Sequence, residues 1–247
     1  MKPASPVRLD KLLANLGYGS RREIGLLAKA GRITLDGAAV PSGETKIRPD
    51  PDLPRRMIVD GEAVDPPPGL ALLLHKPLGV TCSHKEAGPL VYGLLPTRWR
   101  RRDPAISTIG RLDKETSGLL LMTDDGALLH RVISPKMHVP KRYLATLARP
   151  LRGDEAEIFA SGTLMLDGEE KPLLPAMLEI LSPTSAHLTL TEGRYHQVRR
   201  MFAAVGNHVE ALHRDRMGRL GLGTLEPGAF RLLDESDLAL VLPPREG

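Results

Sequence analysis

The chain has 247 residues, a length that allows one large domain or a small module followed by a catalytic domain. Hydrophobic residues make up 41% of it, which excludes global disorder, and aromatic residues make up only 3%, which excludes broad aromatic platforms as the main means of binding RNA. The formal net charge is +4, and the single cysteine, Cys82, excludes an intrachain disulfide and a thiolate zinc site.

The beginning of the chain predicts a short leader and two helices. Residues 1–6 have no apolar stretch of the signal-peptide type and are expected to be loose. An apolar stripe with i, i+3, i+4, i+7 spacing predicts a helix over residues 9–16. Ser20 and Glu23 have the spacing of a capping box, so a second helix begins there and ends at Gly31.

Two hairpins and a stiff linker follow these helices. Asp-Gly pairs at 36–37 and 60–61 stand between short apolar runs, and this pattern is typical of tight hairpin turns. Residues 7–65 are therefore expected to form a compact module of helices and small strands. Three prolines and a glycine then predict a domain linker over residues 66–70.

The rest of the chain, residues 71–243, predicts a larger domain. Short apolar or alternating runs predict strands at 70–74, 119–122, 142–147 and 187–190. A helix is expected over 195–205, with Val198, Met201, Phe202 and Val205 on one face. Because strands and helices alternate irregularly, we predict an α+β fold with a mixed, mainly antiparallel sheet flanked by helices.

Basic residues gather in three separate parts of the chain. Residues 7–34 contain six lysines or arginines against two acids, residues 98–102 contain four arginines, and residues 130–152 contain six basic residues and no acid. Such clusters fit either a path for a polyanion across two domains or scattered solvated faces, and charge alone does not choose between them.

Arg21 and Arg22 occupy the first turn of the second expected helix, where the helix dipole disfavours cations. The amides of a helix N-terminus already attract an anion, so two arginines beside them would make a phosphate clamp. The alternative is that both side chains simply point into water.

The wording of this module resembles the alpha-L RNA-binding domain. The resemblance is carried by VRLDKLL at 7–13, GSRRE at 19–23 and GRITLDG at 31–37. That family more often has Asn where this chain has Asp36, but Asp-Gly serves the same turn. The resemblance implies RNA binding, and we assign RNA contacts to Arg8, Lys11, Arg21 and Arg22.

The segment GRLDKETSGLL at 110–120 sets a carboxylate in a polar loop directly before a buried strand. Taken alone, Asp113 would more often be a salt-bridge or cap residue. The sequence of the whole segment, however, resembles the signature of the RsuA family of pseudouridine synthases, which modify ribosomal RNA. The resemblance implies that Asp113 is the catalytic carboxylate and that Arg111 helps hold the flipped-out nucleotide.

Further segments resemble the same family in the same order. EGRYHQVRRMF at 192–202, continuing to 214, matches its downstream motif, KRY at 141–143 matches the segment that supplies the active-site tyrosine, and LHKPLG at 74–79 matches the opening of the catalytic domain. The resemblance assigns catalytic roles to Tyr143 and Arg199, and we assign substrate contacts to Arg194 and Gln197. The sequence of the downstream motif, residues 192–214, favours 16S rRNA as the substrate.

The implied reaction breaks the bond between uracil and ribose, turns the base and rejoins it through carbon 5. No atoms are gained or lost, so we expect no redox cofactor and no metal. Asp113 would act either as a nucleophile or as a base on the ribose, and the sequence leaves both routes open. A nearby cation would keep the carboxylate ionised, a role that the resemblance gives to Arg199. Since Arg199 lies off the apolar stripe of its helix, it is free to face a cleft.

Other readings remain open from sequence alone. One is the same reaction on 23S rRNA, another is a non-catalytic RNA-binding or ribosome-assembly protein, and a third is a helix-turn-helix DNA binder, which leaves most of the chain unexplained. The histidines at 196, 208 and 213 match no zinc spacing, and no phosphate-loop motif is present. We expect a cytoplasmic monomer without a membrane span, with ribosomal RNA as its partner.

Overall fold

A computed structural model describes residues 5–83 and 86–242, and these form two compact units. Unit 1 runs through residue 71 and includes two later segments, 95–107 and 123–126. Unit 2 contains the remaining described residues. Most of the expected leader, residues 1–4, and residue 243, the expected end of the catalytic domain, lie outside the described residues.

Unit 1 begins with the two helices that the sequence predicts. Helix α1 spans Leu9–Asn15 and helix α2 spans Arg21–Lys29. The capping box is present: the Ser20 hydroxyl accepts a hydrogen bond from the Glu23 amide at 3.3 Å, and the Glu23 carboxylate accepts one from the Ser20 amide at 2.7 Å. The apolar faces of both helices are buried in the core of unit 1.

A small sheet carries both expected hairpins, with strand order β3-β2-β5-β6. Asp36, Gly37, Asp60 and Gly61 all have positive φ, as a type I′ turn requires, so both turn predictions are confirmed. The remaining elements of this part are short. The strands and helix are β1 Val7–Arg8, β2 Ile33–Leu35, β3 Ala38–Ala39, β4 Lys46–Ile47, α3 Leu53–Arg56, β5 Met57–Val59 and β6 Glu62–Ala63.

The two later segments of unit 1 are tied to it by ion pairs. Arg98 binds Asp65 at 2.6 Å and lies over the ring of Tyr18, with its guanidinium 4.1 Å from the ring centroid. The Arg102 and Asp124 side chains are each only 1% exposed and pair at 2.7 Å. The basic run at 98–102 is therefore not wholly an RNA-facing surface, because two of its arginines neutralise acids inside the protein.

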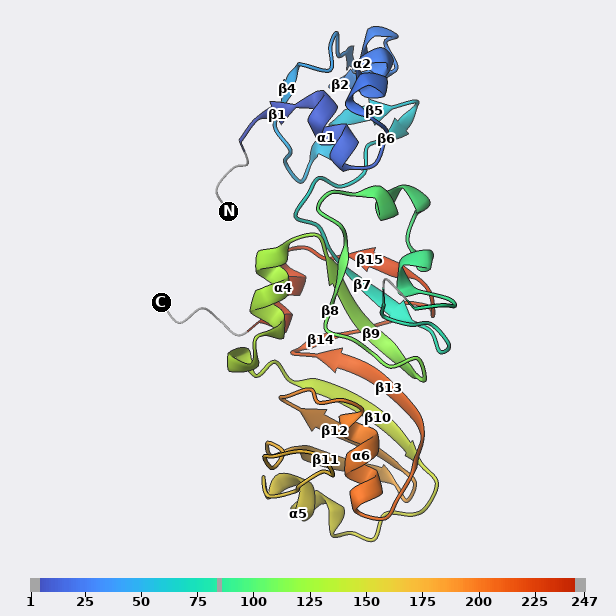
Figure 1. Cartoon of the computed structure of the whole chain (residues 1–247), viewed down its shortest axis with the longest axis vertical. Coiled ribbons are helices and arrows are strands. Elements are labelled where there is room, and N and C mark those ends of the chain that lie inside the picture. Colours follow the sequence, from blue (N-terminus) through green and yellow to red (C-terminus); the bar gives the residue numbers. More distant parts are fainter. Residues whose placement is uncertain (1–4, 84–85, 243–247) are drawn as a thin grey trace. The chain divides into compact units, whose positions relative to one another are not determined.

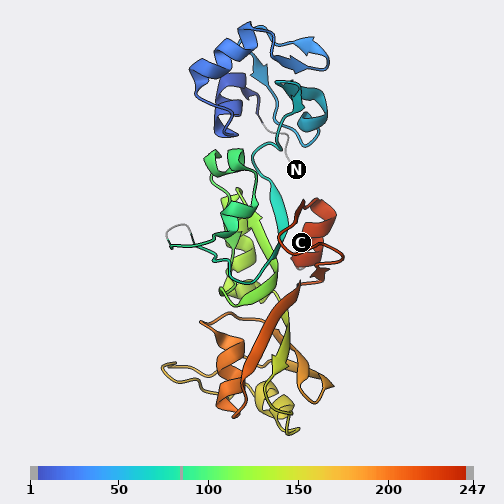
Figure 2. The same cartoon turned by 90° about the vertical axis from the view of Figure 1, so that its right-hand side faces the viewer.

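Unit 2 is built on one large sheet, seen in Figure 1, with the path β11-β12-β10-β13-β9-β7-β15. Neighbours on this path for which pairing is given are antiparallel, except that β13 and β9 are parallel, so the predicted mixed and mainly antiparallel sheet is confirmed. Figure 2 shows β10 and β13 side by side. The strands are β7 Ala71–Lys76, β8 Ser107–Ile109, β9 Thr116–Thr123, β10 Lys141–Leu147, β11 Met177–Ser182, β12 Ser185–Leu190, β13 Val209–Met217, β14 Leu220–Gly221 and β15 Phe230–Leu232.

Short helices accompany the sheet: α4 Gly126–Ile133, α5 Glu155–Ala160, α6 Gln197–Ala204 and α7 Glu235–Val241, with 3₁₀ turns at Val91–Leu94 and Pro135–Met137. A further 3₁₀ turn, Thr97–Arg101, belongs to unit 1. The apolar stripe of α6 is buried in the core of unit 2, as the sequence predicts. The helix begins two residues later than predicted, because Tyr195 and His196 form a turn in which His196 is left-handed, with φ 49°.

Within residues 5–83 and 86–242, none of the helices has both the length and the apolar character needed to cross a membrane.

Candidate active site

A cleft of about 730 Å³ opens in unit 2 and is lined by half of the site residues that the sequence singles out. Its volume is in the usual range for small-molecule sites. Three stretches and two strands line it: residues 109–113, 132–139 and 190–198, with side chains from β10 and β13. Asp113, Tyr143, Arg111, Arg194 and Gln197 all lie on its walls, whereas Arg199 does not.

Asp113 sits in the loop between β8 and β9, and the backbone of this loop is held from below by Lys76. The Lys76 side chain is fully buried and donates to the Thr116 carbonyl at 2.8 Å and to the Pro77 carbonyl at 3.0 Å. Burial lowers the pKa of Lys76, and the charge of Asp113 is among the groups that oppose this. The ammonium of Lys76, which belongs to strand β7, thus holds the loop by binding its backbone carbonyl oxygens.

Arg199, expected beside the Asp113 carboxylate, reaches the back of the same loop instead. Its guanidinium donates to the carbonyls of Glu115 at 2.9 Å and Val209 at 2.7 Å. Arg199 lies off the buried stripe of α6, as predicted. The acceptors that its guanidinium reaches are carbonyl oxygens at the start of β13 and at the end of the loop. Among the described residues, no lysine or arginine forms an ion pair with Asp113.

The register of the central strands brings Arg214 next to Tyr143. Strand β13 pairs Arg214 with Gly118 of β9 and with Tyr143 of β10. A Cβ at Gly118 would collide with the Arg214 backbone, and Gly118 has φ 113°, so this position requires glycine. The buried Arg214 guanidinium donates to the Leu119 carbonyl at 2.8 Å and to the Tyr143 hydroxyl at 3.4 Å.

One nitrogen of Arg214, Nη2, is buried without a hydrogen-bond partner among the described residues. An unpartnered charged donor is costly inside a protein, and Arg214 lines the cleft. This arginine is therefore suited to receive an acceptor that enters the cleft.

Lys141 adds a second cation to the same wall. Its ammonium donates to the Val139 carbonyl at 3.0 Å. Burial and the positive charge of Arg214 lower the pKa of Lys141 to about 8, while Glu192 opposes the shift. The charge on this wall therefore changes within an accessible pH range.

The turn before α6 places His196 next to the loop that carries Asp113. His196 Nε2 lies 3.3 Å from Asp113 Oδ1, and both side chains are a little over one-third exposed. The His196 ring stacks on Tyr195, with ring centroids 3.9 Å apart and planes at 14°. Asp113 is thus contacted by a histidine from the second motif, and this contact links the two motifs in space.

Arg194 and Gln197, expected to bind substrate, have their polar groups engaged within the protein. Arg194 pairs with Glu169 and Glu192, both at 3.1 Å, and also donates to carbonyls of residues 171 and 172. The Gln197 amide is buried, accepts from the Arg194 amide and donates to Glu192. Both residues line the cleft, but they brace the turn that carries His196. Arg111, in contrast, is exposed on the cleft wall.

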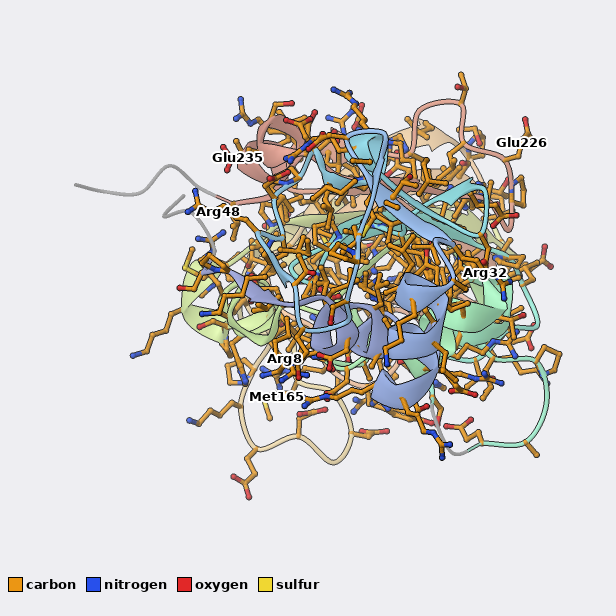
Figure 3. All side chains as sticks on the ribbon, turned by 90° about the horizontal axis from the view of Figure 1, so that it is seen from above. Arg8, Arg32, Arg48, Met165, Glu226 and Glu235 are labelled. Carbon is orange, nitrogen blue, oxygen red and sulfur yellow. The ribbon has the colours of Figure 1, made fainter. Side chains whose placement is uncertain are left out.

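The four basic residues assigned to the first module belong to unit 1. Arg21, Arg22 and Lys11 are exposed, as a phosphate contact requires. Arg8 is bound to Asp10 at 2.7 Å and to Glu44 at 3.1 Å, so its charge is partly neutralised. Figure 3 shows Arg8 near the start of α1, and Arg32 beyond the end of α2.

The sequence did not assign a role to three residues that line or brace the cleft: Lys76, His196 and Arg214. All three lie in segments that resemble the family. Their roles depend on partners far along the chain, such as the loop carbonyls that bind Lys76 and the carboxylate that faces His196. Among the described residues, no group of three or more His, Cys, Asp or Glu side chains is arranged to hold a metal ion.

Comparison with known proteins identifies the family of both parts of the chain. A family model described as RNA pseudouridylate synthase matches residues 71–204, and an S4 domain model matches residues 7–50. A protein of Escherichia coli K12 named ribosomal small subunit pseudouridine synthase A is 42% identical over 96% of this chain and 100% of its own length.

Two further comparisons cover nearly the whole chain. A Bacillus subtilis protein named as an uncharacterized RNA pseudouridine synthase is 41% identical over 97% of this chain and 100% of its own length. A crystal structure described as pseudouridylate synthase superposes with a TM-score of 0.66 at 35% identity, covering 96% of this chain and 100% of that one.

Proposed function

Because this chain belongs to the RNA pseudouridylate synthase family, we propose that it isomerises one uridine of 16S ribosomal RNA, with Asp113 as the catalytic carboxylate. The observation that carries the proposal is the position of Asp113 on the cleft wall, at the junction of a braced loop and a buried strand. The choice of 16S rRNA rests on the relatives that are named for the small ribosomal subunit.

The reaction asks Asp113 to act on the sugar of a uridine that has left its stack. Asp113 either attacks carbon 1 of the ribose while uracil departs, or removes a ribose proton so that the base is eliminated. In both routes the freed uracil turns and its carbon 5 bonds to carbon 1 of the ribose. In the first route this displaces the Asp113 carboxylate, and in the second Asp113 returns the ribose proton to the sugar. The proton on carbon 5 is then lost, and nitrogen 1, which had been bonded to the sugar, takes up a proton. Atoms balance without a co-reactant.

Tyr143 and Arg214 form the wall on which the uracil ring would rest. The Tyr143 ring is half-buried, so it offers one face to the cleft, and Arg214 holds its hydroxyl. The unpartnered Nη2 of Arg214 can donate to a carbonyl oxygen of the detached base. We assign Arg111, exposed on the opposite loop, to the phosphates of the extruded nucleotide.

The remaining site residues position other residues of the site and do not contact the substrate themselves. His196 is a positioning residue, because its 3.3 Å contact fixes the Asp113 carboxylate. Arg199 and Lys76 hold the backbone of the catalytic loop, and Arg194 and Gln197 hold the turn of His196. This division differs from the expectation that Arg199 contacts the carboxylate and that Arg194 and Gln197 contact the substrate.

The test of the proposed function is pseudouridine mapping by carbodiimide-blocked primer extension on unmodified 16S and 23S transcripts. One new stop in 16S supports both the reaction and the substrate. A stop only in 23S keeps the reaction and overturns the substrate. If neither naked transcript reacts, partly assembled small subunits are the second substrate, and no stop there would leave an RNA binder without the activity.

We expect the first module to contribute phosphate contacts through Arg21 and Arg22. Replacing both by Ala should weaken rRNA binding and flatten its salt dependence by about 0.7–0.9 in slope for each lost contact. Filter binding at several salt concentrations measures both quantities. Arg55→Ala is the matched control, since Arg55 is 85% exposed and pairs with Asp52. An unchanged slope in the double variant would show that these arginines hold no phosphate.

A pH dependence follows from Lys141, whose pKa is lowered to about 8. Its ammonium is charged below that pH and loses its charge as the pH rises through 8. If this cation helps to hold RNA in the cleft, affinity falls between pH 7 and pH 9. Lys141→Arg should remain charged and abolish this pH-dependent fall, since arginine does not titrate there. The same loss of affinity in wild type and in Lys141→Arg would assign it to another group.

A further inference from the structure

Tyr195 is an exposed aromatic ring at the catalytic cleft. Its side chain is 71% exposed, and it is the one aromatic residue among the large exposed hydrophobics of the described chain. The chain has only eight Phe, Trp and Tyr residues, and several of them, such as Phe159, Phe202 and Trp99, are buried. An isolated exposed apolar side chain needs no explanation by itself. The position of this one does, because it lines the cleft next to the catalytic loop.

One face of the Tyr195 ring is already occupied. It stacks on His196 at 3.9 Å, and His196 in turn contacts Asp113 at 3.3 Å. With 71% of the side chain exposed, the opposite face of the Tyr195 ring is accessible. The three side chains therefore form a row from Asp113 through His196 to Tyr195, and the outer face of the Tyr195 ring is open.

The backbone holds this ring in place. His196 is left-handed, a conformation that residues other than glycine adopt at a cost, so surrounding contacts must enforce it. Gln197 accepts from the Arg194 amide, and the Arg194 guanidinium is bound by Glu169 and Glu192. Tyr195 is thus carried on a braced turn, and the stack on His196 supports one face of its ring.

A nucleobase is the ligand that fits such a surface. When a uridine leaves its stack to enter the cleft, each neighbouring base loses a stacking partner on one face. A flat aromatic ring stacks on any base without regard to its sequence. The basic side chains Arg111 and Lys141 line the same cleft and favour the polyanionic backbone that would carry that base.

We propose that the open face of Tyr195 binds a nucleobase next to the isomerised uridine, as a stacking subsite of the active site. The proposal rests on the proposed function, because it takes RNA as the substrate of this cleft. It adds a binding site on a residue that the catalytic step does not use.

The test compares Tyr195→Phe, Tyr195→Leu and Tyr195→Ala. Phe keeps the ring, whereas Leu keeps apolar surface without a π face. We expect Phe to match wild type, and we expect Ala and Leu to lose affinity for rRNA by about 5- to 150-fold, the usual effect of removing one base–aromatic stack. Binding is measured in the Asp113→Asn background, which does not convert the RNA, and single-turnover isomerisation is measured with Asp113 intact.

A matched control is Met177→Ala on the edge strand β11, which removes an exposed apolar side chain (63% exposed) outside the cleft and should change nothing. A second arm uses synthetic RNA with an abasic site on either side of the target uridine. One abasic site should weaken binding to wild type but not weaken binding to Tyr195→Ala any further, because both changes remove the same stack.

The outcomes separate the two proposals. Equal affinity of Tyr195→Ala and wild type, equal losses in Phe and Ala, or abasic effects that simply add in the double change would each overturn the stacking subsite. If wild-type protein isomerises no rRNA, the proposed function fails, and the binding comparison between Phe, Leu and Ala still decides whether Tyr195 stacks on a base.

Discussion

We expect Asp113→Asn to abolish isomerisation of uridine and to leave the fold and RNA binding intact. Asparagine has the shape of aspartate but is neither a nucleophile nor a base, so both routes open to the carboxylate are lost. We expect the single-turnover rate to fall by roughly 10³-fold or more, in line with the loss of a catalytic acid–base group. The side chain is 38% exposed, and within the described part of the chain its ion-pair partner is His196, so little stability is lost with its charge.

The measurement is pseudouridine formation at the mapped site, alongside rRNA affinity and thermal unfolding of the same preparations. Asp154→Asn is the matched control, because Asp154 is an exposed carboxylate outside the cleft, beside Arg152. Turnover of Asp113→Asn near the wild-type rate would remove Asp113 from the reaction. Loss of activity together with loss of cooperative unfolding would instead indicate a structural role.

Local rules predict the helices and turns of unit 1 well, because their determinants lie within a few residues of each other. Ser20 and Glu23 close a capping box three residues apart, and each Asp-Gly pair fixes its own turn through positive φ. Four strands of unit 2, β7, β9, β10 and β12, were visible as short apolar or alternating runs, whereas the central strand β13 was not predicted. The start of α6 was predicted too early, because the left-handed His196 is enforced by contacts of Arg194 and Gln197 that no periodicity reveals.

The candidate site follows the same division. The motifs predicted which segments gather, and the structure brings Asp113, Tyr143 and the 192–198 segment to one cleft. They did not predict what each cation binds. Arg199 lies off the buried face of its helix, as predicted, but its guanidinium binds two backbone carbonyls and not the Asp113 carboxylate. Arg214 lies next to Tyr143 because the register of β10 and β13 pairs these two residues. Such pairings join residues far apart in sequence, so only the folded chain determines them.

The expected linker shows what composition alone does not reveal. Three prolines and a glycine at 66–69 predict a stiff segment between two domains, but they do not say which side chains contact it. In unit 1, however, the Pro66 carbonyl accepts a hydrogen bond from Arg102 at 3.0 Å, and the Gly69 amide donates to Asp124 at 2.8 Å. The same two side chains form the buried ion pair, so the linker is held by residues that follow it by more than thirty positions.

The second large effect is therefore expected from Asp124→Ala. This change leaves the Arg102 charge buried at 1% exposure without its partner and frees the Gly69 amide. Breaking a buried pair from one side costs about 3–5 kcal/mol, far more than the pair itself contributes when intact. Trp99, the chain's one tryptophan, lies in unit 1 with the Arg102 guanidinium 5.8 Å from its ring centroid, so its fluorescence during urea unfolding reports on this unit.

Two comparisons decide whether burial causes the loss. Asp52→Ala breaks the exposed pair with Arg55 and should shift the urea midpoint little, since solvent screens that pair. Arg102→Met combined with Asp124→Ala should recover part of the loss, because no uncompensated charge then remains buried. If Asp124→Ala unfolds at the same urea concentration as Asp52→Ala, the buried pair does not stabilise unit 1.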